Sequence, residues 1–120
     1  MKNIIIGEIA EQYALDFLIK QGLRLLEKNF ETKLGEIDLI MEHKDQIVFV
    51  EVRYRSYLSH GGAAASIQKN KQLKIIRTAT LYLQKKKWLH KRYSRFDVVA
   101  IDLIAGTTQI DWIKNAFPGR

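Results

Sequence analysis

A segment of helical periodicity lies between two strongly apolar runs, and this arrangement most constrains the fold. From residue 67 to 84, apolar residues recur at three- and four-residue intervals, as on one face of a helix. The flanking runs, 46–54 and 96–103, have the β-branched and aromatic composition of buried strands. A helix that connects two neighbouring strands of one sheet leaves them parallel, because the chain crosses over before it returns. The sequence therefore predicts an α/β fold with a mixed sheet.

The other segments predict the element order α-β-β-β-α-β-β. Residues 3–21 read as a helix that ends at Gly22, with its apolar stripe made by Ile5, Ile6, Ile9, Tyr13, Phe17 and Leu18. Strands are expected over 23–30 and 35–42, with a polar turn at 43–45 before the strand at 46–54. We expect a glycine-containing loop over 55–65, a turn at 105–108 and a last short strand over 109–113. A length of 120 residues supports one core, so 1–120 is expected to be a single domain.

Composition excludes several classes of protein. The chain has no cysteine, which excludes a disulfide framework, a thiolate zinc site and a cysteine nucleophile. The apolar run Ile4-Ile5-Ile6 is too short for the core of a signal peptide, and no run approaches the roughly 20 residues of a membrane helix. We therefore expect a cytoplasmic protein that does not act in a membrane.

The charged residues are unevenly distributed along the chain. All 13 acidic residues lie in 8–51 or 97–111, whereas 52–96 holds 12 basic residues and no acid. A concentrated positive field favours a polyanion, most often nucleic acid, although a solvated basic surface is the plainer interpretation. The candidate nucleic-acid-binding residues in this segment are Arg55, Lys69, Lys74, Arg77, Lys85, Lys86, Lys87, Lys91 and Arg92.

Carboxylates interrupt the two apolar strands of the predicted hairpin. If Glu42 opposes Ile47 across the turn, Asp38 lies opposite Glu51 and Glu36 lies opposite Arg53. Directly opposed side chains have Cβ atoms about 5 Å apart, where two like charges are destabilising. A divalent cation would compensate them, since hard oxygen ligands suit Mg²⁺ or Mn²⁺. The alternative is a structural pair between Glu36 and Arg53, beside carboxylates that are merely solvated.

The ordered set of motifs resembles a known family over nearly the whole chain. The motifs are Gly7-Glu8 with Glu11, Gly35-Glu36-Ile37-Asp38-Leu39-Ile40, Phe49-Val50-Glu51-Val52-Arg53, Lys71 with its helix to Tyr82-Leu83, Arg95-Phe96-Asp97-Val98-Val99-Ala100 and Asn115-Ala116-Phe117. This set resembles the YraN-like family of predicted endonucleases, which is similar to archaeal Holliday-junction resolvases within the PD-(D/E)XK nuclease superfamily. The resemblance implies a restriction-endonuclease-like fold, with a central mixed sheet flanked by helices.

The resemblance also implies roles for individual residues. Asp38 and Glu51 match the metal-binding acids, Glu11 or, less well, Glu8 matches the acid on the first helix, and Lys71 matches a polar position that reaches the active site. Arg53 stands where the motif normally has lysine. Arginine keeps the charge but cannot act as a base, because it is not deprotonated in proteins. The catalytic set implied is Glu11, Asp38, Glu51, Arg53 and Lys71, with Mg²⁺ or Mn²⁺ as cofactor.

Three functions follow as hypotheses. The first is a metal-dependent endonuclease that acts on DNA, including branched or structured DNA, and a homodimer is one possible state because the related resolvases are dimers. The second is a non-cleaving nucleic-acid-binding protein that retains the nuclease fold, which Arg53 favours. The third is a small basic RNA- or ribosome-associated protein.

Trp88 and Tyr93 lie among lysines and arginines, so they either stack on bases or anchor a charged loop. His60 is a weaker candidate for contact with substrate.

Overall fold

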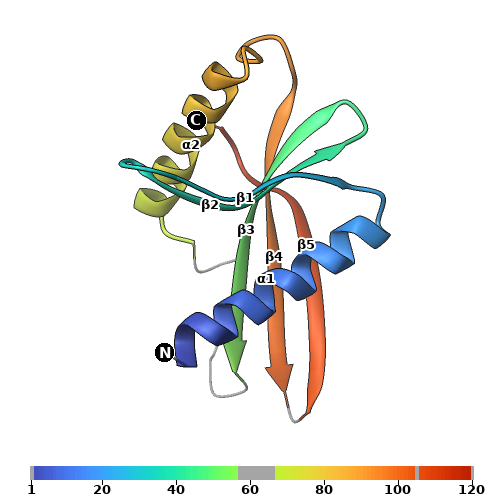
Figure 1. Cartoon of the computed structure of the whole chain (residues 1–120). Helices are drawn as coiled ribbons and strands as arrows, with labels where there is room; N and C mark the ends of the chain where they lie inside the picture. Colours follow the sequence, from blue (N-terminus) through green and yellow to red (C-terminus); the bar gives the residue numbers. More distant parts are fainter. Residues whose placement is uncertain (1, 57–66, 105, 120) are drawn as a thin grey trace.

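Two helices and five strands follow one another along the chain. They are α1 (Lys2–Lys20), β1 (Arg24–Thr32), β2 (Gly35–His43), β3 (Gln46–Ser56), α2 (Lys69–Lys85), β4 (Ser94–Ile104) and β5 (Thr107–Phe117). The computed structural model describes residues 2–56, 67–104 and 106–119 (Figure 1). Its strands form one sheet in the spatial order β1-β2-β3-β4-β5. β3 and β4 are parallel and the other neighbours are antiparallel, which confirms the mixed α/β sheet and the crossover through α2.

The last strand differs most from its predicted bounds. β5 has 11 residues, Thr107–Phe117, whereas the apolar pattern suggested only 109–113. It lies at the edge of the sheet and most of its side chains are at least partly exposed, so the alternation that identifies a half-buried strand is weak there. The loop expected over 55–65 begins within β3, and its remainder, 57–65, lies outside the described residues.

The sheet separates two apolar cores, one under each helix (Figure 1). Side chains alternate along β3, so Phe49 joins the core under α2 whereas Val48 and Val50 join the core under α1. On α2 the predicted apolar face is buried, including Ile75, Thr78, Ala79, Tyr82 and Leu83.

The predicted stripe of α1 is partly wrong. Ile9 and Tyr13 are about half exposed, whereas the small residues Ala10 and Ala14 lie against the sheet together with Leu18. Small side chains allow the backbone of a helix to approach the strands closely, so the alanines take the buried positions that the pattern gave to Ile9 and Tyr13.

The hairpin of β1 and β2 leaves the sheet beyond the middle of β2. The β2–β3 pairing runs from His43–Gln46 to Leu39–Val50, so the register predicted from the turn is confirmed over these residues. The β1–β2 pairing continues further, to Thr32 and Gly35. The paired register therefore stops before Glu36 and Arg53, so these two residues are not partners in the β2–β3 ladder.

Contact with α2 explains why the hairpin turns away (Figure 1). Gly35 has a φ of 155°, and a Cβ there would lie 3.0 Å from Thr78 Oγ1 and 3.4 Å from Lys74 Cβ. Only glycine allows this approach without a shift in its neighbours. The contact holds the start of β2 against α2, and β2 and β3 separate there.

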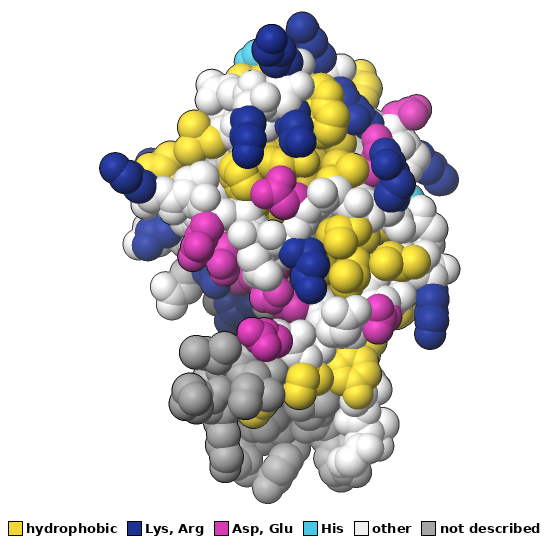
Figure 2. Space-filling model, viewed as in Figure 1, with side chains coloured by type: hydrophobic (Ala, Val, Ile, Leu, Met, Phe, Trp, Pro, Cys, Tyr) yellow, Lys and Arg dark blue, Asp and Glu magenta, His cyan; other side chains and the backbone are white. Residues whose placement is uncertain are grey.

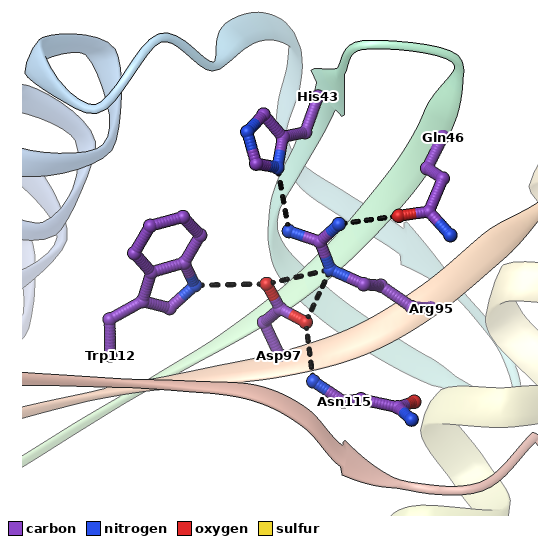
Figure 3. A network of polar contacts seen from close by, with 6 residues as sticks. All are labelled: His43, Gln46, Arg95, Asp97, Trp112 and Asn115. Atoms are coloured by element: carbon purple, nitrogen blue, oxygen red, sulfur yellow. Dashed lines mark hydrogen bonds and ion pairs between the residues drawn. The ribbon is translucent and has the colours of Figure 1, made fainter.

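A buried polar network holds β5 against β4 (Figure 3). Asp97 is fully buried and accepts hydrogen bonds from Arg95 Nε at 3.0 Å, Trp112 Nε1 at 2.9 Å and the Asn115 backbone N–H at 2.9 Å. The register between β4 and β5 shifts at this point, and Asn115 has a φ of 53°. The carboxylate thus satisfies a donor that the bulge removes from the ladder. The Arg95-Phe96-Asp97 motif is structural.

A helix that crosses a membrane needs about 20 predominantly apolar residues in a row. In the described part of the chain, no helix is both long enough and apolar enough to cross a membrane.

Candidate active site

Two carboxylates meet where β2 separates from β3. Asp38 lies directly before Leu39, the first residue of β2 that pairs with β3, and Glu51 directly follows Val50, the partner of Leu39 on β3. Asp38 Oδ2 accepts a hydrogen bond of 2.8 Å from the Val52 backbone N–H, a donor that the departing strand no longer uses. The two acids interact directly, as the cross-strand argument predicted, even though the backbone ladder has ended.

Burial makes this pair of acids unusual. Burial is the main reason that the pKa of Asp38 is raised to about 8, and the charge of Glu51 raises it further. The hydrogen bond from Val52 opposes these two effects. The Glu51 side chain is only 6% exposed, and its Oε2 lies 2.7 Å from Lys71 Nζ. Near neutral pH the site therefore holds a proton on Asp38 and an ion pair between Glu51 and Lys71.

The pair opens into hollows on both sides. Asp38, Glu51 and Lys71 line two adjoining spaces of about 400 and 360 Å³. The first space is also lined by Gly35, Glu36, Gln68, Asn70, Lys74 and Ile75, and the second by Gly7, Ala10, Glu11, Val52, Arg53 and Tyr54. On the face shown in Figure 2, acidic side chains gather where α1 crosses the sheet, with lysine and arginine side chains around them. The arrangement is an open groove that an extended ligand can enter.

The structure distinguishes between the two helical acids. Glu11 lines the second space, and its charge acts on Asp38, whereas Glu8 is exposed and lines neither space. Burial raises the pKa of Glu11, and an interaction with the Asn29 side chain partly offsets this. The sequence alone allows either Glu8 or Glu11 as the helical acid of the site and favours Glu11.

Glu36 also belongs to this acidic group, although the register predicted from the turn places it opposite Arg53. It lines the first space on the side of α2. Burial raises its pKa, and the charges of Glu31 and Glu51 add to the effect. The polar residues of β2 could have indicated that Glu36 belongs to the site. Its place beside the groove, however, depends on the bend of the β1–β2 hairpin, and that bend depends on α2.

Two cations reach the carboxylates from different elements. Lys71 comes from the first turn of α2, and Arg53 lies two residues beyond Glu51 on β3, where it lines the second space. The spacing of residues along the sequence does not predict the contact of Lys71 with Glu51, because this contact depends on how α2 packs on the sheet. Only the family resemblance pointed to Lys71.

The remaining basic candidates divide into three groups. Lys69, Lys74 and Arg77 are exposed on α2, and Lys85, Lys86, Lys87 and Lys91 are exposed at and after its C-terminal end. Arg92 is partly buried, pairs with Glu42 at 2.5 Å and lies over the Trp88 ring at 4.8 Å. The Arg55 side chain lies outside the described residues, as does His60.

A complete metal shell is not supplied by side chains alone. Among the residues that the structure describes, no three or more His, Asp or Glu side chains are grouped so that they could hold a metal ion. Asp38 and Glu51 offer two hard oxygen ligands in an open groove, which is the number that Mg²⁺ commonly takes from protein when waters and substrate phosphate complete its shell.

Comparison with known proteins places the chain in a family. The model of a family described as "Uncharacterised protein family UPF0102" matches residues 10–101. A UPF0102 protein of Herminiimonas arsenicoxydans is 49% identical over 112 residues, which cover 93% of this chain and 86% of the relative. A UPF0102 protein of Stutzerimonas stutzeri is 47% identical over 111 residues, covering 92% of each chain. A relative from Legionella pneumophila is 46% identical over 111 residues, again with 92% of each covered. This chain belongs to the UPF0102 family, the YraN-like family that its motifs resemble.

Proposed function

We propose that the protein is a metal-dependent endonuclease that hydrolyses phosphodiester bonds in DNA. The observation that carries the proposal is the contact between Asp38 and Glu51 at an open groove, with Lys71 2.7 Å from Glu51. Two interacting, largely buried carboxylates destabilise a fold unless a cation compensates them. Perturbed acids of this kind are concentrated at functional sites.

The residues fit a divalent metal ion held by Asp38 and Glu51. Both acids supply oxygen ligands, and the raised pKa of Asp38 means that a metal must displace a proton. Lys71 already supplies one positive charge to the pair, so the site is built for a cation. When bound, Mg²⁺ or Mn²⁺ would polarise a phosphodiester and neutralise charge that develops on it.

The chain's own residues would bind and orient the substrate. Lys71 and Arg53 line the groove on either side of Glu51, where their charges can hold a phosphate. Arg53 can donate two parallel hydrogen bonds to phosphate oxygens, whereas Lys71 acts as a point charge. Glu11 faces the same space and can accept a proton or a hydrogen bond from a water molecule there.

The finer fold assignment follows the same proposal. We assign the chain to the PD-(D/E)XK nuclease fold, which is supported by acids on two adjacent antiparallel strands, a helical acid from α1 and a parallel crossover through α2. The basic residues exposed along α2 support DNA as the substrate, read through its shape and backbone rather than through base edges. Branched or structured DNA and a homodimer come from the resemblance to resolvases.

Arg53 favours a second candidate, a non-cleaving nucleic-acid-binding protein of the same fold. Arginine cannot take a proton from an attacking water molecule, so a mechanism that needs the usual lysine would fail here. In that case Lys71 would serve permanently as the counter-ion of Glu51.

A cleavage panel separates the two candidates. Single-stranded, duplex, flap and four-way-junction DNA would each be incubated with the parent protein, with Mg²⁺ or with Mn²⁺. The nuclease proposal expects cleavage of at least one substrate that is lost in Glu51→Gln and retained in Asp111→Asn, a change at an exposed acid on β5. Binding of DNA without cleavage under any of these conditions would support the second candidate instead.

A further inference from the structure

A second hollow lies at the opposite end of α2 from the carboxylates. It has a volume of about 440 Å³ and is open to solvent between the helix, the 88–93 segment and the start of β4. Ala79, Leu83 and Phe96 are buried residues that form its apolar floor. A smaller hollow of about 300 Å³ adjoins it and shares His90, Arg92 and Tyr93. We call the two together the Tyr93 pocket.

The wall of this pocket is held in place by backbone contacts. α2 ends in a Schellman arrangement, in which Lys87 has a φ of 62° and the Trp88 N–H donates to Leu83 O at 2.8 Å. The Trp88 ring packs edge-on against Tyr82, and the Arg92 guanidinium lies over it. Trp88 is therefore the hydrophobic anchor of the two interpretations that the sequence left open.

Tyr93 differs from Trp88 because its ring is presented to solvent. The residue is 80% exposed, although its backbone is fixed by a hydrogen bond of 2.9 Å from Ile47 N–H to its carbonyl oxygen. His90, on the same wall, has a φ of 63°, in the left-handed region that non-glycine residues rarely adopt. An exposed aromatic ring on this turn, beside an apolar floor, offers a stacking platform.

The charge around the pocket selects the ligand. Arg92 lines both hollows and Lys91 lines the smaller one, while Lys86 and Lys87 are exposed just before them along the chain. Arg92 is paired with Glu42, and Lys91 carries a further positive charge on the lining. An apolar slot with a free aromatic edge and cations at its rim matches a nucleobase with its phosphates, since every base has a face that stacks. A paired base is stacked within its duplex, so the base that enters must be unpaired.

A ridge of polar residues connects the pocket to the carboxylates. Lys71, Lys74 and Arg77 follow one another every three residues along α2, and the next position, Thr80, lines the pocket. Residues three apart form a continuous ridge on a helix surface. From Lys71 to Leu83 the helix rises about 18 Å. For a duplex whose axis runs along α2, each strand advances about 3.4 Å per nucleotide along that axis, so this distance spans about five nucleotides.

We infer that the Tyr93 pocket binds an unpaired nucleobase, about five nucleotides along the strand from the phosphate held at Asp38 and Glu51. The inference deepens the proposed function by naming a feature of the substrate, and it rests on the DNA-binding part of that proposal. The Tyr93 ring stacks on the base, and the cations of the α2 ridge contact the intervening phosphates.

Binding measured in EDTA tests the pocket without requiring cleavage. The probes are a duplex with one extrahelical adenine, the same duplex with an extrahelical abasic residue, and the fully paired duplex. The proteins are the parent, Tyr93→Ala, Tyr93→Phe and Tyr13→Ala, the last a change at a half-exposed tyrosine on α1. The parent and Tyr13→Ala should prefer the adenine over the abasic probe about tenfold, a value within the range of one stacked base. Tyr93→Phe should keep the preference and Tyr93→Ala should lose it.

Other results would overturn the inference. If the parent binds the adenine and abasic probes with equal affinity, the pocket does not bind a base. If Tyr93→Ala loses the same amount of affinity for all three duplexes, Tyr93 contacts DNA without recognising an unpaired base. Absence of binding to any probe overturns the pocket and the DNA-binding proposal together. If the base preference is present but no DNA is cleaved in Mn²⁺, the nuclease proposal fails and the pocket stands. Where cleavage occurs, the cut should map about five nucleotides from the extrahelical base.

Discussion

Replacing Asp38 with asparagine should stabilise the protein at alkaline pH and have little effect in acid. Asparagine keeps the shape of the side chain, and its carbonyl oxygen can still accept the hydrogen bond from Val52 N–H. Its amide can donate to Glu51, which keeps its ion pair with Lys71. The substitution therefore removes the cost of ionising Asp38 in the folded protein without leaving a buried donor unpaired.

The direction follows from proton binding. The pKa of Asp38 is raised to about 8 in the folded state, against about 3.9 in an unfolded chain. Between these two values the folded state binds more protons, so this group lowers the free energy of unfolding as pH rises from about 4 to about 8. Its upper limit is about 6 kcal/mol, at about 1.4 kcal/mol per tenfold change in proton binding. Because the side chain is still partly exposed, we expect about 1–2 kcal/mol.

Thermal unfolding in EDTA at pH 4.5 and pH 8.5 would measure the effect. One kcal/mol corresponds to about 3–6 °C for a chain of this size, so Asp38→Asn should unfold about 3–12 °C above the parent at pH 8.5 and close to it at pH 4.5. Asp111→Asn, at an exposed position on β5, is the matched control and should follow the parent at both values. A parent that is equally stable or more stable than Asp38→Asn at pH 8.5 would refute the reasoning.

The remaining predictions concern the cations. In a steady-state assay, Arg53→Lys should cleave at a rate within about tenfold of the parent, a difference of about 1.4 kcal/mol in the transition state. Arg53→Ala should lose much more of the cleavage rate. Strong activation by Arg53→Lys would instead show that the parent lacks a required base. Lys71→Met should bind Mn²⁺ several-fold more tightly, because its ammonium group no longer competes for Glu51, yet cleave about a hundredfold more slowly; weaker binding by calorimetry would contradict the competition. Changing all three lysines of 85–87 to alanine should weaken binding to every duplex sequence about equally and reduce the salt slope by up to about 3; an unchanged slope would remove them from the DNA-facing surface.

The hairpin register was predictable because its causes are local. A short polar turn at 43–46 and strict alternation in two apolar strands leave little choice of pairing, and the structure has this register as far as Leu39 and Val50. This was sufficient to bring Asp38 and Glu51 together. The strand departure beyond Leu39 was not predictable, since it depends on Gly35 contacting Thr78 and Lys74 of α2.

The first helix shows a second limit of sequence reasoning. The pattern favoured a stripe that includes Ile9 and Tyr13, but the sheet contacts the alanines Ala10 and Ala14. Hydrophobic periodicity weights large residues, whereas close packing of a helix on a sheet selects small ones. This rotation of α1 directs Glu11 toward Asp38 and leaves Glu8 exposed.

The number of basic residues in 52–96 did not predict which of them form ion pairs. Within 52–96, Arg95 is bound to Asp97, Arg92 is bound to Glu42 and Lys71 is bound to Glu51. All three acidic partners lie outside the acid-free segment, so pairing that depends on the tertiary fold is invisible to a count along the chain. Lys69, Lys74 and Arg77 remain exposed along α2.

Titration of Mn²⁺ is the most direct test that Asp38 and Glu51 form a metal site. Calorimetry or electron paramagnetic resonance would follow Mn²⁺ binding at pH 7 and pH 8.5, with and without uncleavable duplex DNA, for the parent, Asp38→Asn, Glu51→Gln and the control Asp111→Asn. The parent and control should bind weakly, more tightly at pH 8.5 because Asp38 must lose its proton, and more tightly with DNA because phosphate completes the shell. Each active-site variant should bind at least about tenfold more weakly, about 1.4 kcal/mol. Equal Mn²⁺ affinity in the parent and both variants would contradict the metal site and the nuclease proposal that depends on it.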